Sequence, residues 1–123
     1  MPMMDDSERE LLSKLRNQKC VPCSSDGDRC SEESTLVHLA VLPGWKLTHD
    51  GQRIRKDWRK KNFLQCLAFF EAVGVIAEAQ CHHPDLHLEG YRNAWIEIWT
   101  HDIDGLSEND FALAAKIDAL EDI

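Results

Sequence analysis

The sequence lacks three features that would assign the protein to a common functional class. Its longest run without a charged residue, Ser34–Trp45, is too short to cross a bilayer. The N-terminal stretch MPMMDDSERE has neither a basic segment nor an apolar one, so we expect no secretory signal and no Arg-rich transit peptide. Positive charge is scarce as well, since 14 basic residues stand against 22 acidic ones, for a net charge of −8. We therefore expect no membrane partner and no direct nucleic-acid binding. The expected location is the cytoplasm, or an organelle if a targeting segment has been removed.

What is present suits a single small domain. The chain has 123 residues, of which 43% are hydrophobic, so it can bury one core. The turn-rich stretch CVPCSSDGDRC predicts a linker. It divides the chain into an N-terminal extension, residues 1–30, which combines a short helix and the linker, and a main domain, residues 31–123.

The cysteines favour free thiols. Five is an odd number, and without an export signal the expected state is reduced. Cys20 and Cys23 have zinc-ligand spacing, and Cys30 follows them, but a clear fourth ligand is lacking. A structural zinc is therefore the less favoured interpretation.

Capping residues and apolar periodicity predict four helices. Two of the starts have the spacing of a capping box, Ser7 with Glu10 and Ser107 with Asp110. Ser31 and Asn62 are the other two candidate N-caps. The expected helices begin at Ser7, run from Ser31 to Pro43, run from Phe63 to about Gln80, and run from Ser107 to about Leu120.

Alternating apolar residues predict four strands between these helices. Asp50-Gly51 and Glu89-Gly90 mark the two tight turns that join them in pairs. Strands paired by hairpins form an antiparallel sheet, which the amphipathic helices would cover on one face. The predicted fold is α+β: a two-layer domain with a four-stranded antiparallel sheet, in the order α-β-β-α-β-β-α.

The long helix is apolar on more than one side. We expect one face to form the buried stripe, and the opposite face suggests wide burial or packing against another subunit. The expected stripe is Phe63, Leu67, Phe70, Val73 and Ala77, and the opposite face carries Leu64, Ala68 and Val75.

Histidines are concentrated where this helix ends, and three interpretations compete. Ligation of a metal by His83, His87 and His101 suits helical spacing, but Pro84 favours an extended chain there. Imidazoles can instead exchange protons near neutral pH, as general acid and general base. In the third interpretation they are polar residues that interact favourably with the helix dipole. Because Pro84 keeps His83 extended, His82 and His83 are expected to point in different directions.

A longer pattern resembles a known family. Glu78, His82-His83-Pro84, Tyr91, His101 and Asp110 recur at fixed spacings in EAQCHHPDLHLEGYRNAWIEIWTHDIDGLSEND. This stretch is similar to the signature of the pterin-4a-carbinolamine dehydratases, and the resemblance extends over about residues 31–120. The KCVPC segment before it resembles the longer members of plants and some protists.

The resemblance implies an activity. Aromatic amino acid hydroxylases leave a 4a-hydroxytetrahydropterin, from which a dehydratase of this family removes water to give the quinonoid dihydropterin, in support of tetrahydrobiopterin recycling. No metal and no organic cofactor is implied. Family members are dimers or tetramers, so a homodimer or homotetramer is expected.

The resemblance also implies the site. His82 and His101 are the acid–base candidates, and His83 would mainly hold the pterin. The residues expected to bind or orient are Glu78, Cys81, Pro84, Trp45, Thr100 and Asp110.

Three positions depart from the animal members. Cys81 stands where they have Asp, Leu86 where they have an aromatic residue, and Asn109 where they have Arg. The alternative function is a non-catalytic binding module, either a dimerisation cofactor of a transcription factor or a protein that handles pterin or molybdenum cofactor.

Overall fold

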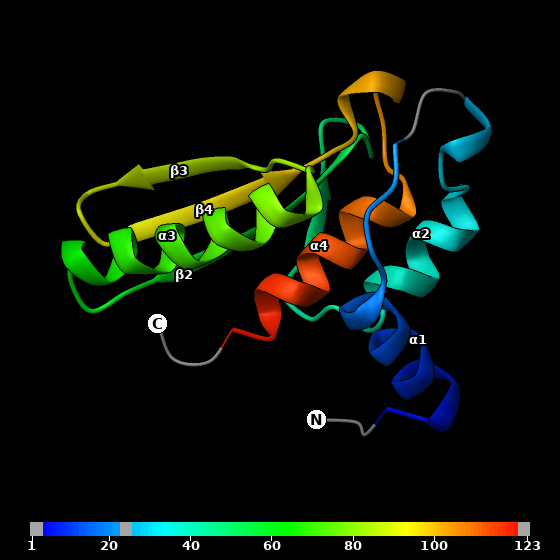
Figure 1. Cartoon of the computed structure of the whole chain (residues 1–123), viewed down its shortest axis with the longest axis horizontal. Helices are drawn as coiled ribbons and strands as arrows, with labels where there is room; N and C mark the ends of the chain where they lie inside the picture. The colour runs from blue at the N-terminus through cyan, green and yellow to red at the C-terminus, as the bar shows by residue number, and fades with distance from the viewer. Residues whose placement is uncertain (1–3, 23–25, 121–123) are drawn as a thin grey trace.

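The computed structural model describes residues 4–22 and 26–120 and consists of an antiparallel sheet with helices on one face (Figure 1). The strands lie in the order β1-β2-β4-β3, and every neighbouring pair is antiparallel. The predicted α+β class is thereby confirmed. The elements are α1 (Asp6–Asn17), the 3₁₀ turn η1 (Asp26–Asp28), α2 (Glu32–Leu39), β1 (Lys46–Thr48), β2 (Arg53–Arg59), α3 (Phe63–Gln80), β3 (Asp85–Glu89), β4 (Asn93–Ile98), the 3₁₀ turn η2 (His101–Ile103) and α4 (Glu108–Asp118).

The helices begin where side chains can accept their first backbone N–H groups. Asn62 Oδ1 accepts from the Gln65 backbone at 2.9 Å, and Ser31 Oγ accepts from Ser34 at 3.0 Å, so both predicted caps are present. The first helix starts two residues earlier than predicted, because Asp5 and Glu8 form the capping box in place of Ser7 and Glu10. Aspartate caps as well as serine does, so the same spacing was available two residues upstream.

The two hairpins set the strand register. The first turn has positive φ at His49, Asp50 and Gly51, so it contains the predicted Asp50-Gly51 pair. The second turn has positive φ at Gly90 and Tyr91, one residue later than predicted. The shift follows from the register, since Glu89 still pairs with Asn93 inside the ladder.

Alternation along β2 separates the two faces of the sheet. Ile54 is fully buried beneath the helices, whereas Arg53 and Arg55 lie on the open face. There the Arg53 guanidinium lies 4.4 Å from the ring centre of Trp99, and that of Arg55 lies 4.7 Å from Trp95. The open face is thus a layer of stacked cations and indoles.

Helix α4 forms the centre of the molecule. In Figure 1 it lies between α3 and the pair α1 and α2, and eight of its residues are buried. Leu15 of α1 is also fully buried in the common core, and Lys116 Nζ donates to the carbonyl oxygens of Leu15 and Arg16. The helix of the extension therefore packs directly on the main domain, while the functional boundary at residue 30 stays a prediction.

Helix α3 buries a different stripe from the one predicted. Val73 and Ala77 are buried, but the stripe continues through Cys66 and Phe69, while Phe63 and Leu67 are 47% and 43% exposed. The opposite face is open, with Leu64 74% exposed. The apolar residues surround the helix, so periodicity alone did not select the buried side.

Within the described part of the chain, α3 is also the one helix long and apolar enough to cross a membrane, with 18 residues of mean hydropathy 1.3. Core helices of soluble proteins meet the same criterion of length and composition, so the criterion alone does not assign α3 to a membrane.

Candidate active site

The site is built where the C-terminus of α3 meets the first turn of α4. His82 Nε2 lies 2.6 Å from Asp110 Oδ1, which joins the two elements. The His82 side chain is 12% exposed, and Asp110 is fully buried. A buried carboxylate requires donors on its remaining lone pairs, and the surrounding chain supplies them.

Asp110 is held by a network at the start of α4. Its Oδ2 accepts from the Thr100 hydroxyl and from the Ser107 backbone N–H, both at 2.8 Å. Thr100 Oγ1 and Ser107 Oγ are also 2.8 Å apart, so the two hydroxyls form a chain to the carboxylate. The Asp110 side chain thus caps α4 and also fixes the imidazole of His82. The position of His82 therefore depends on the same hydrogen bonds that begin α4.

His83 also has a carboxylate partner, but this pair lies on the surface. Its Nε2 lies 2.7 Å from Glu78 Oε1, but the two side chains are 63% and 82% exposed. The pair spans the last turn of α3, so it is a local contact on the surface.

The end of α3 directs these two imidazoles apart. Cys81 adopts the left-handed conformation, with φ 52° and ψ 36°, and the His82 backbone N–H donates to the Ala77 carbonyl oxygen. This is a Schellman-type helix end, which usually employs glycine at the left-handed position. The chain then leaves the helix so that His82 turns inward and His83 turns outward.

His101 reaches the same region from the end of β4. Its ring lies 4.1 Å from that of Trp99, and the Trp99 indole N–H donates to Asp85 Oδ2 at 3.2 Å. An isolated bridge between Thr100 and Gly105 closes the loop that carries His101. His101 is therefore presented on a short turn that both Trp99 and Thr100 anchor.

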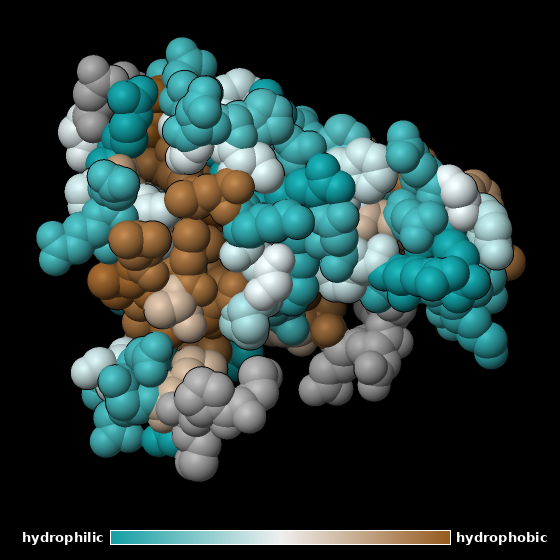
Figure 2. Space-filling model, turned by 180° about the vertical axis from the view of Figure 1, so that it is seen from behind, coloured by the Kyte–Doolittle hydropathy of each residue, from teal (hydrophilic) through white to brown (hydrophobic). Residues whose placement is uncertain are grey.

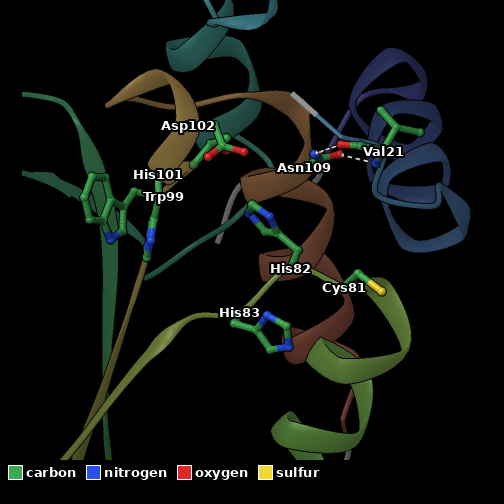
Figure 3. Close-up of a pocket in the computed structure, with 9 residues that line it drawn as sticks. Val21, Cys81, His82, His83, Trp99, His101, Asp102 and Asn109 are labelled. Atoms are coloured by element: carbon green, nitrogen blue, oxygen red, sulfur yellow. Dashed lines mark hydrogen bonds between the residues drawn. The ribbon is translucent and has the colours of Figure 1, made fainter. Parts of the chain in front are cut away.

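One small cavity brings all three predicted catalytic histidines together. Its volume is about 210 Å³, and Figure 3 shows His82, His83 and His101 around it. The lining consists of Val21, Cys81, His82, His83, Trp99, Thr100, His101, Asp102 and Asn109.

Of the other predicted site residues, Cys81 and Thr100 belong to this lining, and the remaining four lie outside it. Glu78 and Asp110 stand behind His83 and His82 as their partners. Pro84 is half-buried and directly precedes β3. Trp45 lies in the core, where its indole N–H donates to Asp118 Oδ2 at 3.0 Å; burial raises the pKa of Asp118 in spite of its contact with Lys56.

Four lining residues were not predicted from the sequence. Trp99, Asp102 and Asn109 are sequence neighbours of Thr100, His101 and Asp110, so proximity to the signature was a usable signal. Val21 gave no such signal, because it reaches the site through Asn109, 88 residues further along the chain.

The metal interpretation finds no matching geometry among residues 4–22 and 26–120. No three side chains of the His, Cys, Asp or Glu type converge there as a metal site requires. His87 stacks on Trp95 on the open face of the sheet, 4.8 Å between ring centres. Cys23, one of the proposed zinc ligands, lies outside the described residues.

The fold and the site together define an α+β protein with a small cavity bordered by imidazoles that are paired with carboxylates. A family model described as Pterin 4 alpha carbinolamine dehydratase matches residues 28–120. The mitochondrial pterin-4-alpha-carbinolamine dehydratase 2 of Arabidopsis thaliana is 48% identical over 113 residues, which are 89% of this chain and 60% of that protein. A bacterial relative, from Halorhodospira halophila, is 44% identical over 106 residues, 86% of this chain and 96% of the relative.

A solved structure agrees with these relatives. The crystal structure of the transcriptional coactivator/pterin dehydratase from Brucella melitensis matches with a TM-score of 0.69 and 26% identity. The match covers 74% of this chain and 96% of that one. The chain belongs to the pterin-4a-carbinolamine dehydratase family, a family of lyases, as its signature predicted.

Proposed function

We propose that the protein dehydrates 4a-hydroxytetrahydropterin to the quinonoid dihydropterin by general acid–base catalysis with histidines. The C4a–O bond breaks and the hydroxyl leaves as water after it receives a proton. N5 loses its proton, and a C4a=N5 double bond forms. One proton is given and one is taken, so the reaction needs an acid and a base on the same site. The observation that carries the proposal is the cavity that His82 and His101 share.

The hydrogen bond to Asp110 suits His82 to the role of base. A carboxylate only accepts, and its other oxygen already accepts from Thr100 and Ser107. Nε2 of a neutral His82 therefore carries the proton, and Nδ1 is left with a lone pair that can take the N5 proton. The buried carboxylate also stabilises the imidazolium that results.

His101 is then the acid. Its ring lies 4.1 Å from that of Trp99, which holds the imidazole at the edge of the cavity. An imidazolium can protonate the departing hydroxyl, which is a poor leaving group without a proton. The positive charge that develops on the pterin ring is stabilised by the same indole and by nearby carboxylates.

The remaining predicted residues hold the substrate or its catalytic groups. His83, whose Nε2 is oriented by Glu78, would accept through Nδ1 from an N–H on the polar edge of the pterin, at the exposed side of the cavity. Cys81 and Pro84 shape the turn that separates His82 from His83, and Thr100 keeps Asp110 in place.

The test is a dehydration assay with chemically generated 4a-hydroxytetrahydropterin. The wild-type chain should accelerate water loss far above the uncatalysed rate. His82→Ala and His101→Ala should each lower kcat by roughly 100-fold or more, the usual worth of a general acid or base. Full kinetics in both variants would refute the assignment of the two histidines.

The proposed assembly is a homodimer or homotetramer through α3. Leu64, Leu67 and Val75 are exposed on this helix, and a further apolar area over α2 contains Leu36 and Val37 (Figure 2). Exposed patches of this kind mark interaction surfaces. Leu64→Glu should lower the mass measured by light scattering if α3 is the interface.

The second candidate function is a binding module. The Brucella melitensis protein is called both a transcriptional coactivator and a pterin dehydratase, which favours testing both roles. Absence of dehydration by an oligomeric, folded wild-type chain would favour this second role. The plant relative is named as a mitochondrial protein, so fractionation should compare an organellar location with the cytoplasmic one predicted from the sequence.

A further inference from the structure

The N-terminal extension reaches the site through Cys20 and Val21, which we call the strap. The Val21 backbone N–H donates to Asn109 Oδ1 at 3.0 Å, and Asn109 Nδ2 donates back to the Val21 carbonyl oxygen. The Cys20 backbone N–H donates to Gln80 Oε1 at 2.9 Å, and the Cys20 thiol lies 3.7 Å from the Asn109 carbonyl oxygen. A side-chain amide that both accepts from and donates to one residue fixes the position and the direction of that residue.

Both anchors of the strap belong to the elements that position His82. Gln80 is the last residue of α3, and Asn109 directly precedes Asp110 in the first turn of α4. The hydrogen bond from His82 to Asp110 crosses between the same two elements. Asn109 is only 4% exposed, so its amide depends on such partners.

The strap also borders the cavity. Val21 and Asn109 belong to its lining, and Figure 3 shows them across the site from Trp99 and His101. At about 210 Å³ the cavity is smaller than the roughly 300–1,000 Å³ of sites that enclose drug-sized ligands. It suits a bicyclic ring whose substituent leaves along the rim.

The chemistry of the pterin identifies which substituent this is. N5 and C6 are bonded neighbours, so a ring whose N5 faces His82 carries its C6 substituent on the side of His82. Gln80 lies two residues before His82, and Asn109 directly precedes Asp110, the partner of His82, and lines the same cavity, so both anchors of the strap are on the side of His82.

The geometry points to Val21 as a wall of the site that contacts the C6 substituent of the pterin, and to Asn109 as the positioning residue that holds this wall. The inference rests on the proposed function, because it takes the orientation of the ring from the role of His82. It gives the extension a part in selecting the substrate, which the signature residues alone do not supply.

The test compares two 4a-hydroxytetrahydropterins, one with a methyl group at C6 and one with a three-carbon dihydroxy side chain. Asn109→Ala releases the strap, Asn109→Asp keeps the acceptor for the Val21 N–H, and Val21→Ala shortens the wall with its backbone bonds intact. Lys14→Ala is the matched control, because it removes only the 3.4 Å contact of Lys14 with Glu108, which also joins the N-terminal extension to the first turn of α4.

Asn109→Ala should raise KM for the long-chain pterin by roughly three- to tenfold, as expected for the loss of one or two neutral hydrogen bonds. The rise should be smaller for the methyl pterin, and kcat should fall less than KM rises. The KM of Asn109→Asp for the long-chain pterin should lie between those of wild type and Asn109→Ala. Val21→Ala should change the ratio of the two KM values in the same direction as Asn109→Ala. Both KM values of Lys14→Ala should match those of wild type. Hydrogen exchange at the Val21 amide should be faster in Asn109→Ala.

An active wild type whose KM ratio is unchanged in both Asn109→Ala and Val21→Ala overturns this inference and leaves the proposed function standing. An inactive wild type overturns the proposed function and the inference together. Should Asn109→Ala not fold, the KM ratio in Val21→Ala decides alone.

Discussion

His82 and His83 are adjacent in the chain, and each bonds a carboxylate through Nε2, yet their surroundings are opposite. The His82–Asp110 pair lies between two helices with its carboxylate fully buried, whereas the His83–Glu78 pair lies on the surface with both side chains mostly exposed. The distances, 2.6 and 2.7 Å, do not distinguish the pairs. Burial does, because it determines whether a carboxylate can fix one tautomer and one position of an imidazole or only contact it transiently.

The comparison assigns the two histidines different duties. Asp110 has Thr100 and Ser107 as further donors, so it cannot turn away from His82 without leaving them unsatisfied. The Glu78 carboxylate is held by no such network among the described residues, since its hydrogen bond there is with His83 alone. We therefore place proton transfer on His82 and substrate contact on His83.

Among the substitutions that test this comparison, Asp110→Asn should have the largest effect on the dehydration rate. The amide can face His82 with an N–H, which would reverse the imidazole tautomer and leave no lone pair toward the substrate. We expect kcat to fall by roughly 10²- to 10⁴-fold. The free energy of unfolding should also fall by about 1–3 kcal/mol, because the Ser107 N–H and the Thr100 hydroxyl lose a charged acceptor. Dehydration kinetics and urea unfolding measure the two effects, and an active, equally stable variant would contradict the assignment.

Glu78→Gln is the matched change on the exposed side, and its effect should be far smaller. An exposed pair contributes less than about 1 kcal/mol to stability, so the urea midpoint should hardly move. KM should rise by a few-fold at most, with kcat near wild type, since the glutamine can still orient His83. A loss of kcat as large as that in Asp110→Asn would show that exposure does not separate the two pairs.

The smallest effect concerns the stability contributed by two carboxylates away from the site, the half-buried Asp118 and the exposed Asp57. Burial raises the pKa of Asp118 above its ordinary value of 3.8, and the hydrogen bond from Arg55 lowers the pKa of Asp57 below it. Asp118 therefore adds stability that is fully present below pH 3.8 and is lost as pH rises through its raised folded pKa. Asp57 adds stability that is present above pH 3.8 and is lost as pH falls through its lowered folded pKa.

Urea unfolding of Asp118→Asn and Asp57→Asn between about pH 3 and pH 6 should expose this difference in sign. The free energy of unfolding of wild type minus that of Asp118→Asn should decrease as pH rises. The corresponding difference for Asp57→Asn should increase with pH. Two curves of the same slope would show that burial does not govern the titration of these groups.

The sequence predicted the parts of the fold that depend on neighbouring residues. Caps at Ser31 and Asn62 and the alternation along the strands are local, and the structure confirms them. The buried stripe of α3 was misplaced at Phe63 and Leu67, because that choice depends on which helix packs against it. The first cap was misplaced because Asp5 and Ser7 offer the same chemistry at the same spacing.

The site was predictable to the extent that its residues lie in one signature. His82, His83 and His101 line the cavity together because the end of α3 and the end of β4 converge there. Trp45 lies in the core and not in the cavity lining, since its indole bonds Asp118. Val21 could not be predicted, because no local pattern indicates a backbone contact with Asn109 across 88 residues.

The central claim, that His82 transfers the proton and His83 holds the substrate, is tested most directly by single-turnover dehydration in His82→Ala and His83→Ala side by side. We predict that the rate of the chemical step falls by roughly 100-fold or more in His82→Ala and by less than about tenfold in His83→Ala, whose loss should appear mainly in KM. Equal losses in the chemical step, or a larger one in His83→Ala, would contradict the account.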